Sequence, residues 1–326
     1  MLRLYDLIDK LGESIKKNNN FFQHKDIIIV GENNSGKSYV IKNILQELVE
    51  HDVYFIDSNN RNIPIERKDI DSTFDKLEIR EILKIRLKSN NFNKEDVFSE
   101  KGNNFVVLNE LIINQIKYKK LFKEVLDIDL IIEEEISEGS LIEQAESELR
   151  ILINNEDLSV ISDGYQAMLR ILMEVDFAYE KGVKNIVIDE FDMHLDHINP
   201  KEFINKLKNK YNEIRFILCC HSVYTILEVN EFDVIKIIKQ YSKDKLENTY
   251  LNFDSNDLNN IEEVDRRLFN TSKKLTDNYI ELNQLIKEFY INNEYNEELI
   301  KSLKSRKLSF RENIVIKHIM SSREKK

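Results

Sequence analysis

The sequence predicts an α/β fold with a mostly parallel central sheet, because two patterns alternate along it. Short apolar runs that are typical of buried strands recur at 27–30, 53–56, 186–188 and 216–218. Between them lie segments whose apolar residues have the three- and four-residue spacing of helices. Strand, helix and strand in this order favour a right-handed crossover between parallel strands. A chain of 326 residues can bury a large core in one or two domains.

The first elements predict a phosphate-binding loop. Residues 4–17 are expected to form an amphipathic helix, and the first strand follows it at 27–30. The next residues fit the pattern G-x-x-x-x-G-K-[ST], and helical spacing resumes at 39–49. Strand, glycine loop and helix together confirm such a loop, because its N–H groups and the helix N-terminus attract phosphate oxygens. We therefore expect a nucleotide to be bound by Gly31, Asn33, Asn34, Ser35, Gly36, Lys37 and Ser38.

Two members of this loop have specific chemistry. Lys37 would reach the β- and γ-phosphates as a cation, and the Ser38 hydroxyl would ligate Mg²⁺. The cofactors that the loop predicts are therefore ATP and Mg²⁺.

The segment after the second strand predicts a helical insertion at about residues 62–130. Its apolar residues recur at helical spacing, for example at Ile79, Ile82, Leu83, Ile85 and Leu87. An acidic run at 133–138 is expected to be a solvated face, with a metal or a basic partner as the alternative. Strands are expected at 149–153 and 158–161.

A second site is expected where the apolar strand at 186–188 ends in Asp189 and Glu190. An aspartate at the carboxyl end of such a strand holds Mg²⁺ in nucleotide hydrolases, so we expect Asp189 and Ser38 to be the metal ligands. Glu190 is placed to orient or deprotonate the attacking water. A strand that simply leaves the core into a polar turn is the alternative, and the loop at Gly31 makes it the weaker one.

Three further segments resemble motifs of one protein family and occur in the same order as in that family. Ser162-Asp163-Gly164-Tyr165-Gln166 resembles the S-x-G-x-Q signature of ABC-type ATPase heads, the residues 191–196 resemble their D-loop, and 216–222 resemble their switch strand. Together with the phosphate loop, the set resembles the bacterial AAA-type branch of ABC ATPases, akin to the OLD and RecF-like heads. The chain departs from the pattern at Cys219-Cys220, where a hydroxyl-bearing residue is usual before the switch histidine. It also begins with a helix where many such heads have antiparallel strands.

The resemblance implies an ATPase that works as a homodimer or larger assembly. Each nucleotide would lie between one subunit's phosphate loop and the other's signature, so Ser162 and Gly164 would contact the neighbour's γ-phosphate. Asp196 of the D-loop would join the nucleotide-binding residues. His221 would sense the γ-phosphate and assist Glu190 in catalysis; a satisfied core histidine is the alternative.

The end of the chain is predicted to be helical. Residues 1–255 are expected to form the ATPase domain with its insertion, and 256–326 a helical extension. A hairpin or edge pair is expected at 234–239 and 249–251. The stretch from Lys301 is basic, which is typical of a solvated terminus or of a contact with nucleic acid or an acidic partner.

The net charge, the length of the apolar runs and the positions of the cysteines limit which partners and which compartment are expected. The net charge of −11 argues against wholesale wrapping of DNA. No apolar run has the length of a bilayer span and no signal peptide is evident, so a cytoplasmic protein without a membrane segment is expected. Cys219 and Cys220 are adjacent in a strand and point to opposite faces, which argues against a disulfide framework.

The function that these observations favour is an ATP-hydrolysing switch that controls a partner. By resemblance, many stand-alone bacterial heads of this kind act in DNA repair or in anti-phage defence beside a nuclease or toxin, and the effector is expected to be a separate chain. Two alternatives stay open: a RecF- or OLD-like repair ATPase that binds DNA, and a nucleotide-bound scaffold that barely turns over.

Overall fold

The protein is described here from a computed structural model. The described residues are 2–31, 35–49, 51–58, 63, 73–88, 92, 106–136, 147–193, 195, 200–226, 229–242, 245–258, 264, 267–268, 282, 285, 289, 295–306, 316–317 and 319–320. Contacts divide the chain into two compact units, Met1–Phe269 and Asn270–Lys326. The domain boundary that the sequence analysis placed after residue 255 stays a prediction.

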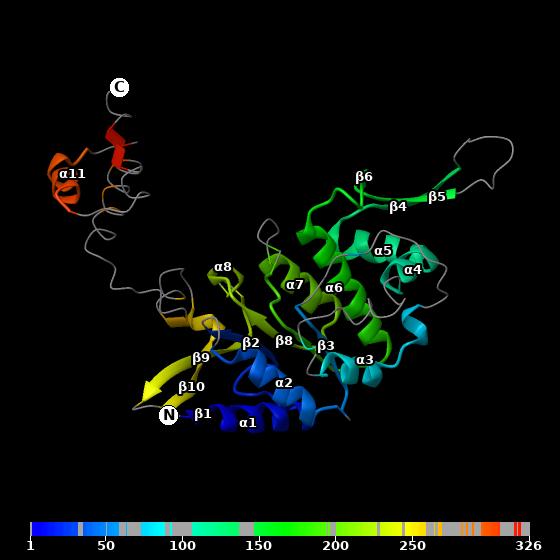
Figure 1. Ribbon diagram of the computed structural model, residues 1–326, viewed down its shortest axis with the longest axis horizontal. Helices are drawn as coiled ribbons and strands as arrows, with labels where there is room; N and C mark the ends of the chain where they lie inside the picture. Colours follow the sequence, from blue (N-terminus) through cyan, green and yellow to red (C-terminus); the bar gives the residue numbers. More distant parts are fainter. Residues whose placement is uncertain are drawn as a thin grey trace. The chain divides into compact units, whose positions relative to one another are not determined.

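A seven-stranded sheet forms the centre of the first unit (Figure 1). Its strand order is β1-β10-β9-β2-β8-β7-β3. Neighbouring strands from β9 to β3 are parallel, and β10 and β1 at one side are antiparallel. The strands are β1 (Leu2–Arg3), β2 (Asp26–Gly31), β3 (Val53–Ile56), β7 (Asn185–Ile188), β8 (Arg215–Cys220), β9 (Phe232–Ser242) and β10 (Lys245–Asp254). The predicted mostly parallel α/β sheet is confirmed, and the hairpin expected near the end of the domain is the pair β9–β10.

Alternating side chains of each strand supply the cores on the two faces of the sheet. In β2, Ile28 and Val30 belong to one buried cluster, whereas Ile27 and Ile29 belong to the other. Cys219 and Cys220 likewise fall into different clusters, and both are free thiols. Because these parallel strands are covered on both faces, they are apolar runs rather than alternating ones, which is why the sequence reveals them.

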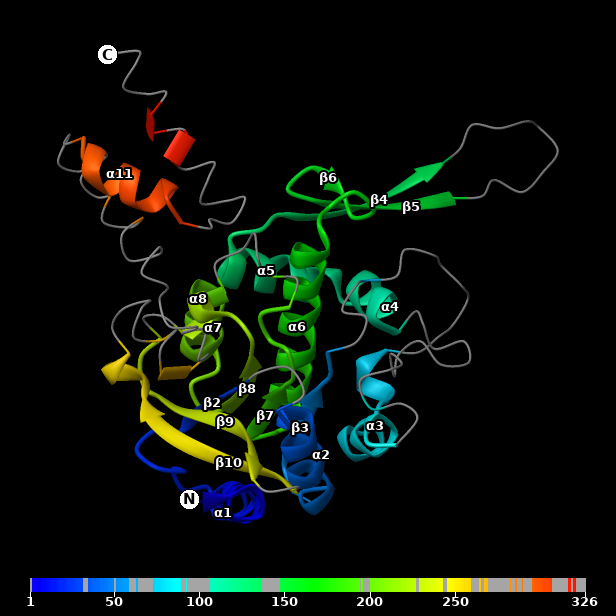
Figure 2. The same ribbon diagram turned by 60° about the vertical axis from the view of Figure 1, so that its left-hand side comes forward.

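Helices cover both faces (Figures 1 and 2). One face packs against α1 and α2, whose apolar residues share a cluster with Ile27 and Ile29. The other packs against α5, α6 and α7. The helices of this unit are α1 (Leu4–Lys16), α2 (Lys37–Glu47), α3 (Ile79–Arg86), α4 (Val106–Ile113), α5 (Gln115–Leu126), α6 (Asp163–Glu180), α7 (Pro200–Lys210) and α8 (Val223–Ile226). The N-terminal helix expected at 4–17 is confirmed by α1.

A smaller antiparallel sheet, β4-β5-β6, projects beside α5 in Figure 2. It consists of β4 (Leu130–Ile136), β5 (Ser147–Ile153) and β6 (Glu156–Asp157). The strand expected at 149–153 lies within β5, but the one expected at 158–161 is wrong, because those residues form a turn. The Asp157 carboxylate accepts hydrogen bonds from the N–H (2.9 Å) and hydroxyl (2.6 Å) of Ser159 and closes that turn.

The second unit has its own small apolar core. Leu282, Leu285, Ile300 and Leu303 are among its buried residues, and its described helix is α11 (Glu297–Lys304). The Asn296 side chain caps α11 by accepting the N–H of Leu299 at 3.0 Å. Within the described residues of both units, no helix is long and apolar enough to cross a membrane.

Candidate active site

The loop between β2 and α2 has the backbone that its glycines demand. A Cβ on Gly31 would lie 2.5 Å from Ser35 Oγ and 2.8 Å from the backbone oxygen of Ile237 on β9, so only glycine fits there. Gly36 precedes α2 with a φ of 104°, a left-handed conformation that glycine adopts without strain. Asn33 and Asn34, which the sequence assigned to the same loop, lie outside the described residues.

Lys37 lies inside this loop. Its side chain is buried, and Nζ donates a 2.7 Å hydrogen bond to the Gly31 carbonyl. Burial lowers the pKa of Lys37 below its ordinary value, although the carboxylates of Asp189 and Glu190 oppose that shift. The Lys37 ammonium group is therefore bonded to a carbonyl of its own loop. A phosphate oxygen is the type of acceptor that would compete with this carbonyl for the ammonium group.

The loop and the end of β7 meet through two oxygen atoms. Ser38 Oγ lies 3.4 Å from Asp189 Oδ2 and donates to it, although the two residues are distant in sequence. Asp189 is only 1% exposed, and its N–H is bonded to the Ile56 carbonyl of β3 at 3.0 Å. A hydroxyl and a carboxylate side by side are ligands that suit Mg²⁺, so this pair fits the predicted metal site.

Glu190 and His221 face each other beside this pair. Glu190 Oε1 lies 3.9 Å from His221 Nε2, and each side chain is about one-third exposed. The Glu190 backbone is left-handed, with φ 48°, and its N–H donates to Asp189 Oδ1 at 3.1 Å. Strained non-glycine residues of this kind concentrate at functional sites. The arrangement places a carboxylate and an imidazole together, as general base and partner require.

Asp192 organises the chain around His221, and the sequence analysis missed this role. Its buried carboxylate accepts the N–H groups of His221 (2.9 Å) and Ser222 (2.6 Å) and the Thr225 hydroxyl (3.0 Å). These bonds fix the turn between β8 and α8 against the turn after β7. The sequence does show that Asp192 closely follows Asp189 and Glu190. The backbone N–H groups that it accepts, however, come from residues that follow another strand, β8.

The loop, Glu190 and His221 line one cleft at the carboxyl ends of β2, β7 and β8. Its volume is about 700 Å³. Its described lining residues are Ser35, Gly36, Lys37, Ser38, Tyr39, Glu190 and His221. Ligands of open α/β sheets bind at this edge. The structure therefore brings together the loop, the strand-end acids and His221.

The signature residues lie elsewhere. Ser162 is the N-cap of α6, and its hydroxyl accepts the N–H of Tyr165 at 3.5 Å. Gln166 is buried and ties this turn to the body, since its side chain accepts the Ile63 N–H (3.1 Å) and donates to the Leu158 carbonyl (3.2 Å). Neither Ser162 nor Gly164 is among the described residues that line the cleft, and Asp196 lies outside the description.

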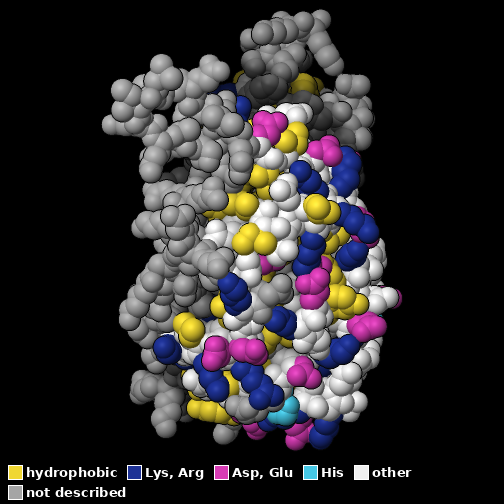
Figure 3. All heavy atoms as spheres, turned by 90° about the vertical axis from the view of Figure 1, so that its right-hand side faces the viewer, with side chains coloured by type: hydrophobic (Ala, Val, Ile, Leu, Met, Phe, Trp, Pro, Cys, Tyr) yellow, Lys and Arg dark blue, Asp and Glu magenta, His cyan; other side chains and the backbone are white. Residues whose placement is uncertain are grey.

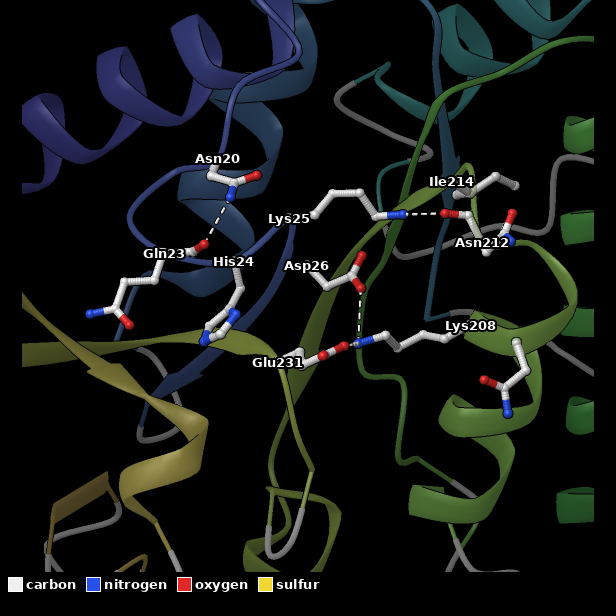
Figure 4. Close-up of a pocket in the computed structure, with 10 residues that line it drawn as sticks. Asn20, Gln23, His24, Lys25, Asp26, Lys208, Asn212, Ile214 and Glu231 are labelled. Carbon is white, nitrogen blue, oxygen red and sulfur yellow. Dashed lines mark hydrogen bonds and ion pairs between the residues drawn. The ribbon is translucent and has the colours of Figure 1, made fainter.

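A second, smaller pocket opens at the opposite edge of the sheet, at the amino ends of β2, β8 and β9 (Figure 4). It has a volume of about 370 Å³ and polar walls. Its two lysines already have protein partners: Lys25 Nζ donates to the Asn212 carbonyl at 2.6 Å, and Lys208 Nζ lies 3.1 Å from Asp26 Oδ2. The cleft at the carboxyl edge is therefore the better candidate for a nucleotide.

No family model matches the chain, and no curated protein matches it. The solved structures that resemble the chain include three Smc head domains. One, with a coiled coil and joint from Pyrococcus yayanosii, is 18% identical with a TM-score of 0.33 and covers 60% of this chain and 35% of its own. Another, an SmcHead bound to the C-winged helix domain of ScpA, is 14% identical with a TM-score of 0.35 and coverages of 66% and 61%.

The third is an Smc head domain with an extended coiled coil bound to the C-terminal domain of ScpA from Pyrococcus furiosus. It is 14% identical with a TM-score of 0.30, and the match covers 76% of this chain and 54% of that one. In each case the match spans less than two thirds of the solved structure's own length.

Proposed function

We propose that the protein binds ATP with Mg²⁺ and hydrolyses its terminal phosphate. The observation that carries this proposal is the cleft that Lys37, Ser38, Glu190 and His221 line, with Asp189 hydrogen-bonded to Ser38. A phosphate-binding loop alone supports binding. The strand-end acids beside it supply metal ligation and a base, which hydrolysis needs.

Each side chain has a role in this proposal. Lys37 neutralises the β- and γ-phosphate oxygens, and the Ser38 and Asp189 oxygens hold the metal. Bound Mg²⁺ supplies Lewis-acid stabilisation of charge on the phosphate oxygens. Glu190 accepts the proton of the attacking water. His221, held by Asp192 through its backbone N–H, orients that water beside Glu190.

We further propose that the signature serves the nucleotide of a second copy. Ser162 and Gly164 belong to a helix N-terminus, where anions are favoured, yet they lie outside their own subunit's cleft. Large apolar side chains around these motifs are exposed, namely Val160 (72%), Tyr165 (41%) and Met193 (41%). Exposed apolar residues beside polar ones mark interaction surfaces, so this region suits contact with another head.

The test mixes two inactive variants. Lys37→Ala removes the cation of the loop, and Gly164→Arg blocks close approach of the signature backbone to phosphate. Each should abolish turnover alone. A mixed dimer keeps one intact loop opposite one intact signature, so ATPase activity should partly return on mixing, with a maximum near equal amounts. Lys184→Ala, which removes an exposed ion pair with Glu213 at the amino end of β7, is the control that should retain activity.

Two results would contradict these proposals separately. Unchanged turnover in folded Lys37→Ala would refute the nucleotide site. Absence of rescue at every ratio, with mixed assemblies shown to form, would refute the shared site unless both sites must fire together. The ATPase activity of mixed dimers that contain one wild-type subunit and one variant subunit distinguishes the absence of a shared site from two shared sites that must fire together.

The biological role that we propose is a switch that controls a separate effector, such as a nuclease or toxin in anti-phage defence. The support is the resemblance of the ordered motifs to such heads. The acidic net charge of −11 also favours a protein partner over wholesale DNA binding. On the face shown in Figure 3, Lys and Arg side chains are interspersed with Asp and Glu. Hydrolysis that rises with duplex DNA would favour the repair alternative, and tight ATP binding without turnover would favour the scaffold.

A further inference from the structure

Two helices run side by side and in the same direction next to the cleft. At their carboxyl ends Lys16 of α1 lies 3.6 Å from Glu47 of α2. At their amino ends Tyr5 interacts with Tyr39 and raises the pKa of Tyr39 above its ordinary value. Figure 1 shows α1 next to α2. The two tyrosines are therefore brought together where α2 leaves the phosphate loop.

Tyr39 is the residue after the predicted metal ligand Ser38, and it lines the cleft. Its side chain is 48% exposed and that of Tyr5 is 68% exposed. Most large aromatic rings of this unit are buried, and Tyr54, Tyr118 and Tyr211 are examples. Scattered exposed aromatics are normal on a protein surface, but Tyr39 lines the cleft that the loop residues and Glu190 also line.

We propose that Tyr39, with Tyr5 beside it, forms the platform on which the base of the bound nucleotide stacks. This inference rests on the proposed nucleotide site and extends it from the phosphates to the base. A tyrosine ring offers a flat face to a nucleobase, and stacking on such a ring tolerates every base because each has a π-face. Tyr39 follows Ser38 in the first turn of α2 and lines the cleft.

Tyr5 supports the platform before a ligand arrives. A ring with a second side chain beside it loses less freedom on binding than an isolated ring, which favours affinity. Tyr5 comes from the helix that the sequence places ahead of the first strand.

Affinity measurements on the full chain test the proposal. MgATP, MgGTP and Mg²⁺ with inorganic tripolyphosphate are titrated into wild type, Tyr39→Ala, Tyr5→Ala and Phe22→Ala. Phe22 is the control, since it is 59% exposed and lies outside the described lining of the cleft. Tyr39→Ala should weaken ATP and GTP by about 5- to 150-fold, as loss of one base–aromatic stack does, and leave tripolyphosphate within about twofold. Tyr5→Ala should weaken the nucleotides less, and Phe22→Ala should change nothing.

A fluorescence experiment gives an independent readout. The chain contains no tryptophan, so Tyr39→Trp introduces a single indole at the proposed platform. ATP and GTP should quench it through stacking, whereas tripolyphosphate should not. Phe22→Trp should respond to none of the three ligands.

The outcomes separate this inference from the function on which it rests. ATP affinity unchanged in Tyr39→Ala, or equal losses of ATP and tripolyphosphate affinity, would overturn the base platform while leaving the phosphate site in place. Wild type that binds neither ATP nor tripolyphosphate would overturn the nucleotide site, and the platform with it.

Discussion

A buried charge cluster joins three elements of the first unit, and replacing Glu174 tests its importance. The Glu174 carboxylate of α6 accepts hydrogen bonds from Arg86 (2.8 Å), Arg170 (3.2 Å) and Tyr54 (2.8 Å). Arg86 closes α3, bonds the Phe55 carbonyl next to Tyr54 on β3, and is 1% exposed like Glu174. This cluster therefore ties the helix that begins at the signature to the sheet.

Glu174→Gln changes charge with little change in shape. It would leave Arg86 and Arg170 buried without their shared carboxylate, although Asp57 stays 3.5 Å from Arg86 Nε. Removing one partner of a buried ion pair costs about 3–5 kcal/mol, against a total free energy of unfolding of about 5–15 kcal/mol. With an m-value of about 3 kcal/mol/M, the urea midpoint should fall by about 1–1.7 M.

The assay is urea unfolding of the full chain at neutral pH, followed by the helical circular dichroism signal. The matched control is Glu213→Gln, which breaks an exposed ion pair with Lys184 and should leave the midpoint unchanged. A Glu174→Gln midpoint within the scatter of that control would refute the reasoning, because the two carboxylates would then contribute alike.

The pH dependence of this difference has a definite sign. Burial opposes ionisation of Glu174, but Arg86 and Arg170 outweigh it and lower the pKa of this carboxyl below its ordinary value of 4.5. A carboxyl with a lowered folded-state pKa stabilises the protein above its unfolded-state pKa. The gap between wild type and Glu174→Gln should therefore be constant near neutral pH and shrink as the pH falls below 4.5.

Three further predictions concern the cleft. Glu190→Gln should retain ATP binding, lose about 10²–10⁴-fold in hydrolysis and accumulate as a closed assembly in size-exclusion chromatography with ATP; a loss of affinity as severe as that of Lys37→Ala would make Glu190 a binding residue. Asp192→Ala should lower turnover and cost about 1–3 kcal/mol of unfolding free energy, because three donors around His221 lose their acceptor; wild-type turnover would contradict this. Gly31→Ala should abolish ATP binding, since its Cβ would lie 2.8 Å from a backbone oxygen, and retained affinity in a calorimetric titration would show that the loop can shift.

Features encoded by contiguous residues were predictable. The strand, glycine loop and helix around Gly36 follow one another along the chain, and the conformation of each depends mainly on its own residues. The apolar run before Asp189 likewise predicts a buried strand that ends in acids, and β7 confirms it. The alternation of such runs with helical spacing was enough for the α/β class.

Local sequence patterns gave a wrong prediction where side-chain hydrogen bonds determine the backbone conformation. Residues 158–161 have the apolar character of a strand, but the Asp157 carboxylate closes a turn there through Ser159. The buried cluster at Glu174 was also missed, since Arg86 and Glu174 are separated by most of the insertion and an acidic residue in a helix is ordinarily a surface residue.

The order of the strands is what only the tertiary structure decided. The sequence by itself determined that the chain has a phosphate loop, a strand ending in Asp189 and Glu190, and a later strand ending before His221. Consecutive strands β2 and β3 are not neighbours, because β8 and β7 lie between them. That order places the end of β8 beside the loop and the end of β7 within 3.4 Å of Ser38. Long-range pairing is set by how both faces of the whole sheet are buried, and no single segment carries that information.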